Sequence, residues 1–270
     1  MKNLLAVIAV ALAVVFTLSP ASVYAKGVSI GAKGGLNLAN LKGSDVDAFT
    51  DADISFGDIG TITMIIDPEE EKKKAASFGV FVTYYINDYF AVQPEFLYSM
   101  KGIRGKRSWV EPWYGPIYDN DMTITYEQTI SLNYLEIPLL AKVSIPMGKS
   151  LKHNMFFGPA MGIITSAKRE YEITGMSEEL KQIYEMFDIP TSGEEDIEDM
   201  RSVDFGLVFG LGLDFKLGPG NAVIDARYTL GLINIIKEIS IDYSFDPALI
   251  ESPDVKNSVI SIMAGYSFSL

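Results

Sequence analysis

The stretch VDFGLVFGLGLDF, residues 203–215, alternates large apolar residues with very small or acidic ones. The large residues are Val203, Phe205, Leu207, Phe209, Leu211, Leu213 and Phe215. Successive side chains of a β-strand point to opposite faces, so the pattern predicts a strand with one bulky apolar face and one nearly empty face. Because glycine weakens a strand, the empty face indicates crowded surroundings, such as a narrow lumen.

The same period of two residues recurs in eight segments of the chain. They are residues 28–41, 77–87, 89–103, 129–145, 153–167, 202–217, 221–235 and 258–270. Tight turns and long connections alternate between them, so antiparallel neighbours place all tight turns at one end and all long loops at the other. This layout is typical of an outer-membrane barrel with short periplasmic turns. We therefore predict an all-β fold, an eight-stranded antiparallel transmembrane β-barrel with an up-and-down meander.

A soluble, lipocalin-like barrel is the alternative, with its apolar face turned inward. Three observations favour the membrane barrel: the second face is poor in charge and rich in glycine, the chain carries an export signal, and aromatic residues gather beside the tight turns and the C-terminus. These aromatic residues are Tyr84, Tyr85, Tyr89, Phe90, Phe156, Phe157, Phe215, Tyr266 and Phe268. Residues 77–87 are ambiguous, since both faces are apolar. Pro94, Pro138 and Pro159 fall inside predicted strands, where we expect bulges or shifted strand limits.

The first residues are expected to be removed from the mature protein. Residues 1–3 are positive, residues 4–18 are apolar, and small residues precede position 26, so residues 1–25 are predicted to be a secretory signal peptide. The barrel domain then covers residues 26–270. The formal net charge of −13 argues against nucleic acid as a partner, and without cysteine the exported chain has no disulfides.

The inward face carries charges that an eight-stranded lumen, only wide enough to be filled by side chains, would bury. The predicted lumen charge network consists of Lys33, Glu95, Glu136, Lys142, Asp225 and Arg227, and further charges on this face are Lys101, Asp204, Asp214 and Lys216. Buried charges must pair, so we expect Glu95 and Glu136 to face Arg227 or Lys142. Gly206, Gly210 and Gly212 are predicted to make room for larger neighbours such as Tyr134, Phe156 and Arg227. A gated narrow pore or a proton path is the alternative.

The residues indicate no enzyme, cofactor or metal. The only histidine, His153, lies at a predicted periplasmic turn, and no nucleophile motif is present. The long loops are acidic, but Asp45, Asp47, Asp51 and Asp53 lack the spacing of a calcium-binding EF-hand loop, so divalent binding stays an alternative to a solvated loop.

Two loops carry features of their own. Residues 177–187 predict a short helix that begins at Ser177, stops before Pro190 and packs on the barrel rim, with a partner-binding helix as the alternative. Trp109, Trp113 and Tyr114 lie among basic residues and predict an interface anchor or, second, a sugar-stacking site.

Six segments carry a resemblance to a known family: QPEFLYSMKG (93–102), LNYLEIPLLAKV (132–143), FFGPAMGI (156–163), DFGLVFGLGLDF (204–215), DARYTLGLINI (225–235) and AGYSFSL (264–270). In order and together they resemble the PorT-type, porin-like outer-membrane β-barrel family of Bacteroidetes and relatives. The resemblance implies an eight-stranded outer-membrane barrel, and in some relatives a part in secretion or gliding machinery.

We expect a non-enzymatic monomer that acts as a structural or interaction scaffold, with a low-conductance channel or a secretion accessory as alternatives. The expected partners are outer-membrane lipid, the barrel-assembly machinery and a protein bound through the external loops. The final strand resembles an assembly signal, although it ends in Leu270 in place of phenylalanine.

Overall fold

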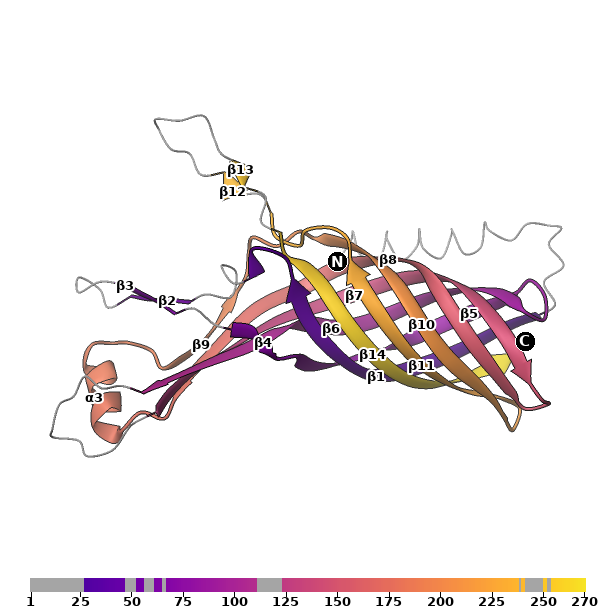
Figure 1. The fold of residues 1–270 in the computed structure, drawn as a ribbon, viewed down its shortest axis with the longest axis horizontal. Coiled ribbons are helices and arrows are strands. Elements are labelled where there is room, and N and C mark those ends of the chain that lie inside the picture. Colours follow the sequence, from indigo (N-terminus) through magenta and orange to yellow (C-terminus); the bar gives the residue numbers. More distant parts are fainter. Residues whose placement is uncertain are drawn as a thin grey trace.

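A computed structural model of the chain describes residues 27–46, 52–55, 61–64, 67–110, 123–237, 239–240, 250–251 and 254–270. Eight long strands form a closed ring (Figure 1). They are β1 (Gly27–Lys42), β5 (Lys73–Tyr85), β6 (Phe90–Val110), β7 (Thr123–Met147), β8 (Leu151–Thr174), β10 (Val203–Leu217), β11 (Gly220–Gly231) and β14 (Lys256–Ser269). The prediction of an all-β, eight-stranded antiparallel barrel is confirmed. The signal peptide predicted for residues 1–25 lies outside the described residues.

Each barrel strand pairs with the next one along the chain, and β14 returns to β1 to close the ring. The closing pair runs in continuous antiparallel register from Ser29↔Ser269 to Lys42↔Lys256. The three tight turns lie at the end that carries the C-terminus, and the four long connections lie at the other end (Figure 1). A closed ring leaves no unpaired wall edge, which is the condition for crossing a bilayer with strands.

Apolar residues of the wall point outward, as the alternation predicts. On β10, Phe209 and Leu211 are exposed, whereas Val208, which precedes Phe209, is buried. The ambiguous segment 77–87 is resolved in the same way, because Phe78 and Val80 face outward while Phe81 is buried in the lumen. The predicted face assignment therefore holds along the ring.

The aromatic residues near the tight turns divide between the two faces. Tyr89, Phe90 and Phe157 are exposed on the outside, as expected of an interfacial belt. Two members of the predicted belt are instead inside: Tyr85 has its hydroxyl 3.5 Å from the Ser29 hydroxyl, and Phe156 is buried. Successive side chains of these strands point to opposite faces, so in each case a neighbouring residue points outward to the interfacial belt.

The three prolines lie inside β6, β7 and β8 without causing bulges. The pairing pauses for two residues after Pro94 and after Pro138 and then resumes in the same register, and Pro159 lies within a continuous register with β10. The expected bulges are absent at these prolines, and all three stay inside their strands, because a missing N–H opens the ladder locally while the pleat continues. The wall register shifts elsewhere, between Asn133 and Tyr134.

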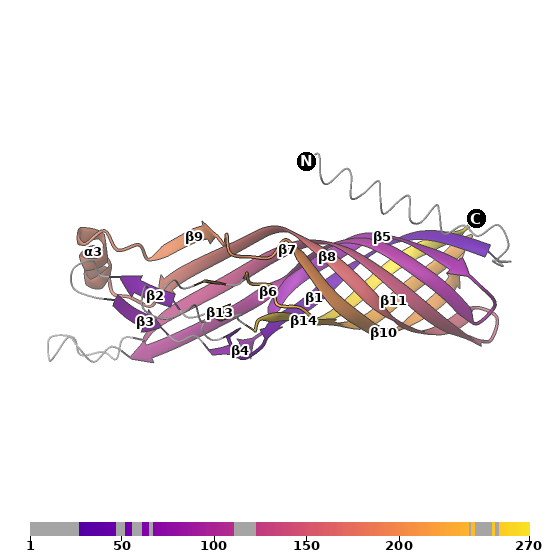
Figure 2. The ribbon, with the colours of Figure 1, turned by 90° about the horizontal axis from the view of Figure 1, so that it is seen from above.

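Three strands continue far beyond the ring at the long-loop end (Figure 2). In this extension β6, β7 and β8 are flanked by β4 (Asp67–Glu71) on one side and β9 (Ser192–Asp196) on the other. The predicted limits for these three strands were too short, because the added residues are largely polar and offer only short apolar alternation, such as Ile124 and Tyr126 on β7. Two small hairpins, β2 (Ala52–Ser55) with β3 (Thr61–Met64) and β12 (Ile239–Ser240) with β13 (Ile250–Glu251), complete the strands.

The helix predicted in residues 177–187 is present as α3 (Glu178–Met186). The Ser177 side chain accepts a hydrogen bond from the backbone N–H of Leu180, as a helix cap should. Its predicted place on the barrel rim is wrong, because Leu180 packs against Ile124 near the outer tip of the extension. In the described part of the chain, no helix has the length and apolar character needed to cross a bilayer.

Candidate functional site

Four charged side chains meet in the middle of the lumen. The Lys33 ammonium lies 2.5 Å from Glu95 and 2.9 Å from Asp225, and the Arg227 guanidinium lies 2.8 Å from each of the same two carboxylates. They come from β1, β6 and β11, so the contacts reach across the barrel. All four residues are buried, and two positive charges balance two negative ones. A buried quartet of this kind is tolerated because every charge has two opposite partners.

The other two members of the predicted network lie apart from this quartet. Lys142 is 3.0 Å from Asp214, and Gln93 connects this pair to the quartet by donating to Glu95 at 2.7 Å. Glu136 pairs with Lys101 at 2.5 Å. The expectation that Glu136 faces Arg227 or Lys142 is therefore wrong, whereas Glu95 does face Arg227. The partner of Glu136, Lys101, lies on the adjacent strand β6.

Aromatic rings lie against three of the lumen cations. Lys33 is 5.1 Å from the centre of the Phe81 ring, Lys101 is 4.5 Å from that of Tyr134, and Arg227 is 5.1 Å from that of Phe156. Each ring attracts the cation through its negative face and excludes water from it. The lumen is thus filled by ion pairs with rings stacked beside them.

The glycines of β10 give these groups their space. A Cβ at Gly210 would come 2.2 Å from the Phe156 ring, and one at Gly212 would come 2.7 Å from an Asp225 carboxylate oxygen. At Gly206 the nearest atom would be the backbone carbonyl oxygen of Leu230, 2.8 Å away. Gly210 and Gly212 therefore leave room for lumen side chains, and Gly206 allows β11 to approach β10 closely.

An apolar cap closes the lumen at the long-loop end. Its buried members come from strand interiors and from the segments that leave and enter the strands: Leu41, Val46, Ile103, Ile130, Leu132, Tyr134, Met200, Ile235, Ile236 and Val255. A bridge between Met200 and Ile236 joins two of these segments. No periodic pattern marks the cap, because most of its loop members are isolated apolar residues in polar stretches.

A side-chain contact fastens the β1 side of the cap. The Asp45 carboxylate accepts a hydrogen bond from the backbone N–H of Asp254 at 2.6 Å. This backbone N–H, together with the Ser44 hydroxyl, holds the pKa of Asp45 below its ordinary value. Neighbouring Val46 belongs to the cap, so the contact ties the β1 end to the start of β14.

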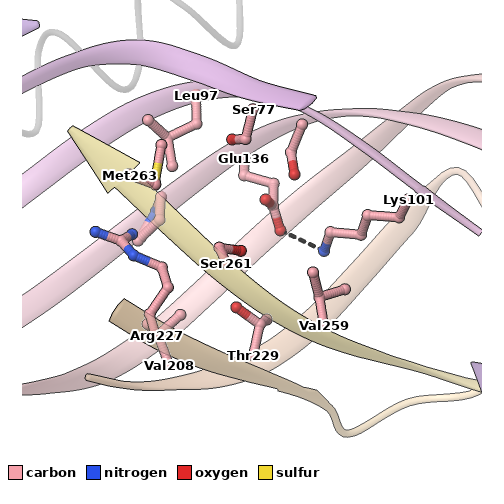
Figure 3. A pocket seen from close by; sticks show the side chains of 12 residues that line it. Ser77, Leu97, Lys101, Glu136, Val208, Arg227, Thr229, Val259, Ser261 and Met263 are labelled. Carbon is pink, nitrogen blue, oxygen red and sulfur yellow. Dashed lines mark hydrogen bonds and ion pairs between the residues drawn. The ribbon is translucent and has the colours of Figure 1, made fainter. Parts of the chain in front are cut away.

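Between the charges and the cap lies a cavity of about 10 Å³, enough for a single water molecule (Figure 3). The labelled side chains of Lys101, Glu136 and Arg227 reach it from three strands. The Arg227 Nε is buried and has no hydrogen-bond partner from the described residues. Lys216, expected in the lumen, is exposed at the tight-turn end.

Potential metal ligands do not cluster among the described residues. No group of three or more His, Asp or Glu side chains among them could hold a metal ion. His153 is partly buried beside the β7–β8 turn. The aromatic and basic cluster predicted around Trp113 and Tyr114, and the acidic pair Asp47 and Asp51, lie outside the described residues.

The chain matches the family described as outer membrane protein beta-barrel domain over residues 19–237. The chain belongs to this family. Its location is accordingly the outer membrane, and the outward apolar wall of the ring is the membrane-spanning surface. No functionally curated protein matches the chain.

Several solved structures are similar to it. Ail, the attachment invasion locus protein of Yersinia pestis, solved with the heparin analogue sucrose octasulfate, shares 15% identity with a TM-score of 0.33, over 90% of this chain and 99% of that one. Neisserial surface protein A shares 13% identity with a TM-score of 0.37, over 90% and 96%. OprG from Pseudomonas aeruginosa shares 12% identity with a TM-score of 0.36, again over 90% and 96%. At these values the family assignment rests on the family match alone.

Proposed function

We propose that this protein is a sealed outer-membrane anchor that holds an acidic extracellular sheet and helix available for interaction, without enzymatic activity. The observation that supports it is the filled lumen, in which buried ion pairs are covered by a buried apolar cap. The cavity between the charges and the cap has room for one water molecule. A barrel closed in this way has no route for solutes. The additional length of β6, β7 and β8 lies outside the membrane.

A low-conductance channel is the competing function. Passage would require the cap to lift and the Lys33–Glu95–Arg227 contacts to separate, which would leave buried charges without partners. The packing supports the sealed state over this alternative.

Planar-bilayer recording of the purified full-length protein tests the proposal. We expect insertion without a steady current, because neither ions nor water have a continuous path. A variant in which the cap residues Met200 and Ile235 are both replaced by serine serves as the comparison. A sustained, ion-selective current from the wild-type protein would contradict the sealed anchor and favour the channel.

Within the family, we place the chain with the PorT-type barrels on the six segments that resemble them, from residues 93–102 to residues 264–270. An accessory role in a secretion or gliding apparatus would suit an anchor with a large external platform. We further propose a monomer, with the barrel-assembly machinery recognising the final strand. Purification in mild detergent tests both ideas, since a stable co-purifying protein would support the accessory role and a lone monomer would argue against it.

A further inference from the structure

Two exposed apolar residues stand apart from all other large ones in the described part of the chain. Every other exposed large apolar side chain lies on a barrel strand or directly beside one, where lipid accounts for it. The exceptions are consecutive: Met186 is 78% exposed and Phe187 is 58% exposed, at the C-terminal end of α3. Adjacent exposed apolar residues of this size on a soluble surface indicate a contact site.

Lipid does not explain this pair, because α3 lies at the far end of the extension (Figures 1 and 2). The helix packs on Ile124, which precedes the outward wall residue Leu135 by eleven positions on β7. At the rise of a β-strand this separation is about 35 Å along the strand. Met186 and Phe187 are therefore held well outside the membrane.

The opposite part of the helix fixes its orientation. Leu180 is buried against Ile124, Tyr126 and Ile173, and Tyr184 packs beside the same cluster. Burial raises the pKa of Tyr126 to about 12, in keeping with an enclosed contact. The helix is thus anchored through one face, and its final turn is left presenting Met186 and Phe187.

The surroundings of the pair are strongly negative. Residues 177–199 contain nine acidic residues and a single basic one, Lys181, which is paired with Glu178 at 2.7 Å. Two of the nine, Glu194 and Glu195 on β9, are paired with Lys168 and Arg169 of β8. Glu185 and Asp188 are exposed and flank the apolar pair. The C-terminal end of a helix adds a partial negative charge of its own, and the last turn of α3 contains no basic residue to offset it.

We propose that Met186 and Phe187 are the apolar centre of a docking site for a basic amphipathic protein segment, whose cations contact Glu185, Asp188 and the negative C-terminal end of α3. Charge complementarity identifies the partner class, since an apolar surface rimmed by carboxylates selects apolar side chains interspersed with Lys or Arg. The site rests on the proposed function in one respect, that the barrel is an anchor for an external platform.

Fluorescence anisotropy of a labelled amphipathic Leu/Lys helical peptide tests the site, using full-length protein in zwitterionic nanodiscs and empty nanodiscs as the blank. The double variant Met186→Ser, Phe187→Ser should weaken binding about tenfold or more, as loss of an interface centre does. Glu185→Gln with Asp188→Asn should weaken it too. The matched control is Glu178→Gln with Glu179→Gln, which removes the same charge from the other end of α3 and should change binding little. Heat-modifiable gel migration verifies that each variant has a folded barrel.

Several results would overturn the site. They are no peptide binding by the wild type, equal binding by the Met186→Ser, Phe187→Ser variant, or an equal loss in the Glu178→Gln, Glu179→Gln control, which would indicate diffuse attraction to a polyanion. Dimerisation of the peptide-free protein that this apolar variant abolishes would show that a second copy is the occupant. None of these results bears on the sealed lumen, which bilayer recording tests separately.

Discussion

Gly210 lies where the lumen has no space for a side chain, since a Cβ would meet both the Phe156 ring and, at 2.8 Å, the carbonyl oxygen of Ala226. We expect Gly210→Val to destabilise the barrel by about 1–3 kcal/mol through overpacking. Ala226→Val on the exposed face of the neighbouring strand is the matched control and should be nearly neutral. Urea unfolding in detergent measures both, and equal effects would undo the assignment of faces.

Arg227 on β11, like Lys33, contacts both carboxylates of the charge quartet. Arg227→Met should cost about 3–5 kcal/mol, since it leaves Glu95 and Asp225 with only Lys33 between them. Adding Glu95→Gln should restore part of the loss by rebalancing the charges. The half-exposed pair Arg104–Glu127 provides the comparison, and Arg104→Met should cost about 1 kcal/mol or less. An unchanged urea midpoint for Arg227→Met would refute the pairing.

At the scale of elements, α3 and the extension should behave independently of the barrel. Ser177→Ala removes the acceptor for the Leu180 N–H and should destabilise the helix locally by about 0.5–2 kcal/mol. Hydrogen exchange should therefore quicken in α3, while the barrel strands and the urea midpoint stay unchanged. Slower or unchanged exchange in α3 would show that the cap contributes nothing, and Ser192→Ala on exposed β9 is the control.

The elements themselves were largely predictable where one face of a strand is apolar. The period of two located all eight wall strands, and Ser177 marked the start of α3, because both signals are local. The outer ends of β7 and β8 escaped prediction, because residues 123–128 and 168–174 are mostly polar and each has only two apolar residues in alternation. The position of α3 could not be predicted from residues 177–187 either, because it depends on the contact of the helix with Ile124, which is distant in the sequence.

For the molecule as a whole, the sequence predicted which residues line the lumen better than which of them touch. Lys33 and Asp225 form an ion pair across an intervening strand, and Glu136 forms one with Lys101. The tilt and stagger of the strands decide which side chains lie at the same height in the barrel. The cap was missed altogether, as Ile235 and its partners come together only after the ring has closed.

The central claim, a lumen sealed from solvent, is tested most directly by thiol accessibility, because the chain has no cysteine of its own. Ser99 is 2% exposed beneath the cap, whereas Ser192 lies exposed on β9. We expect a charged thiol reagent to modify Ser99→Cys about a hundredfold more slowly than Ser192→Cys, because reaction requires local opening. Opening the cap with Met200→Ser and Ile235→Ser should remove most of this protection. Equal modification rates at the two positions in the otherwise unchanged protein would contradict the sealed lumen.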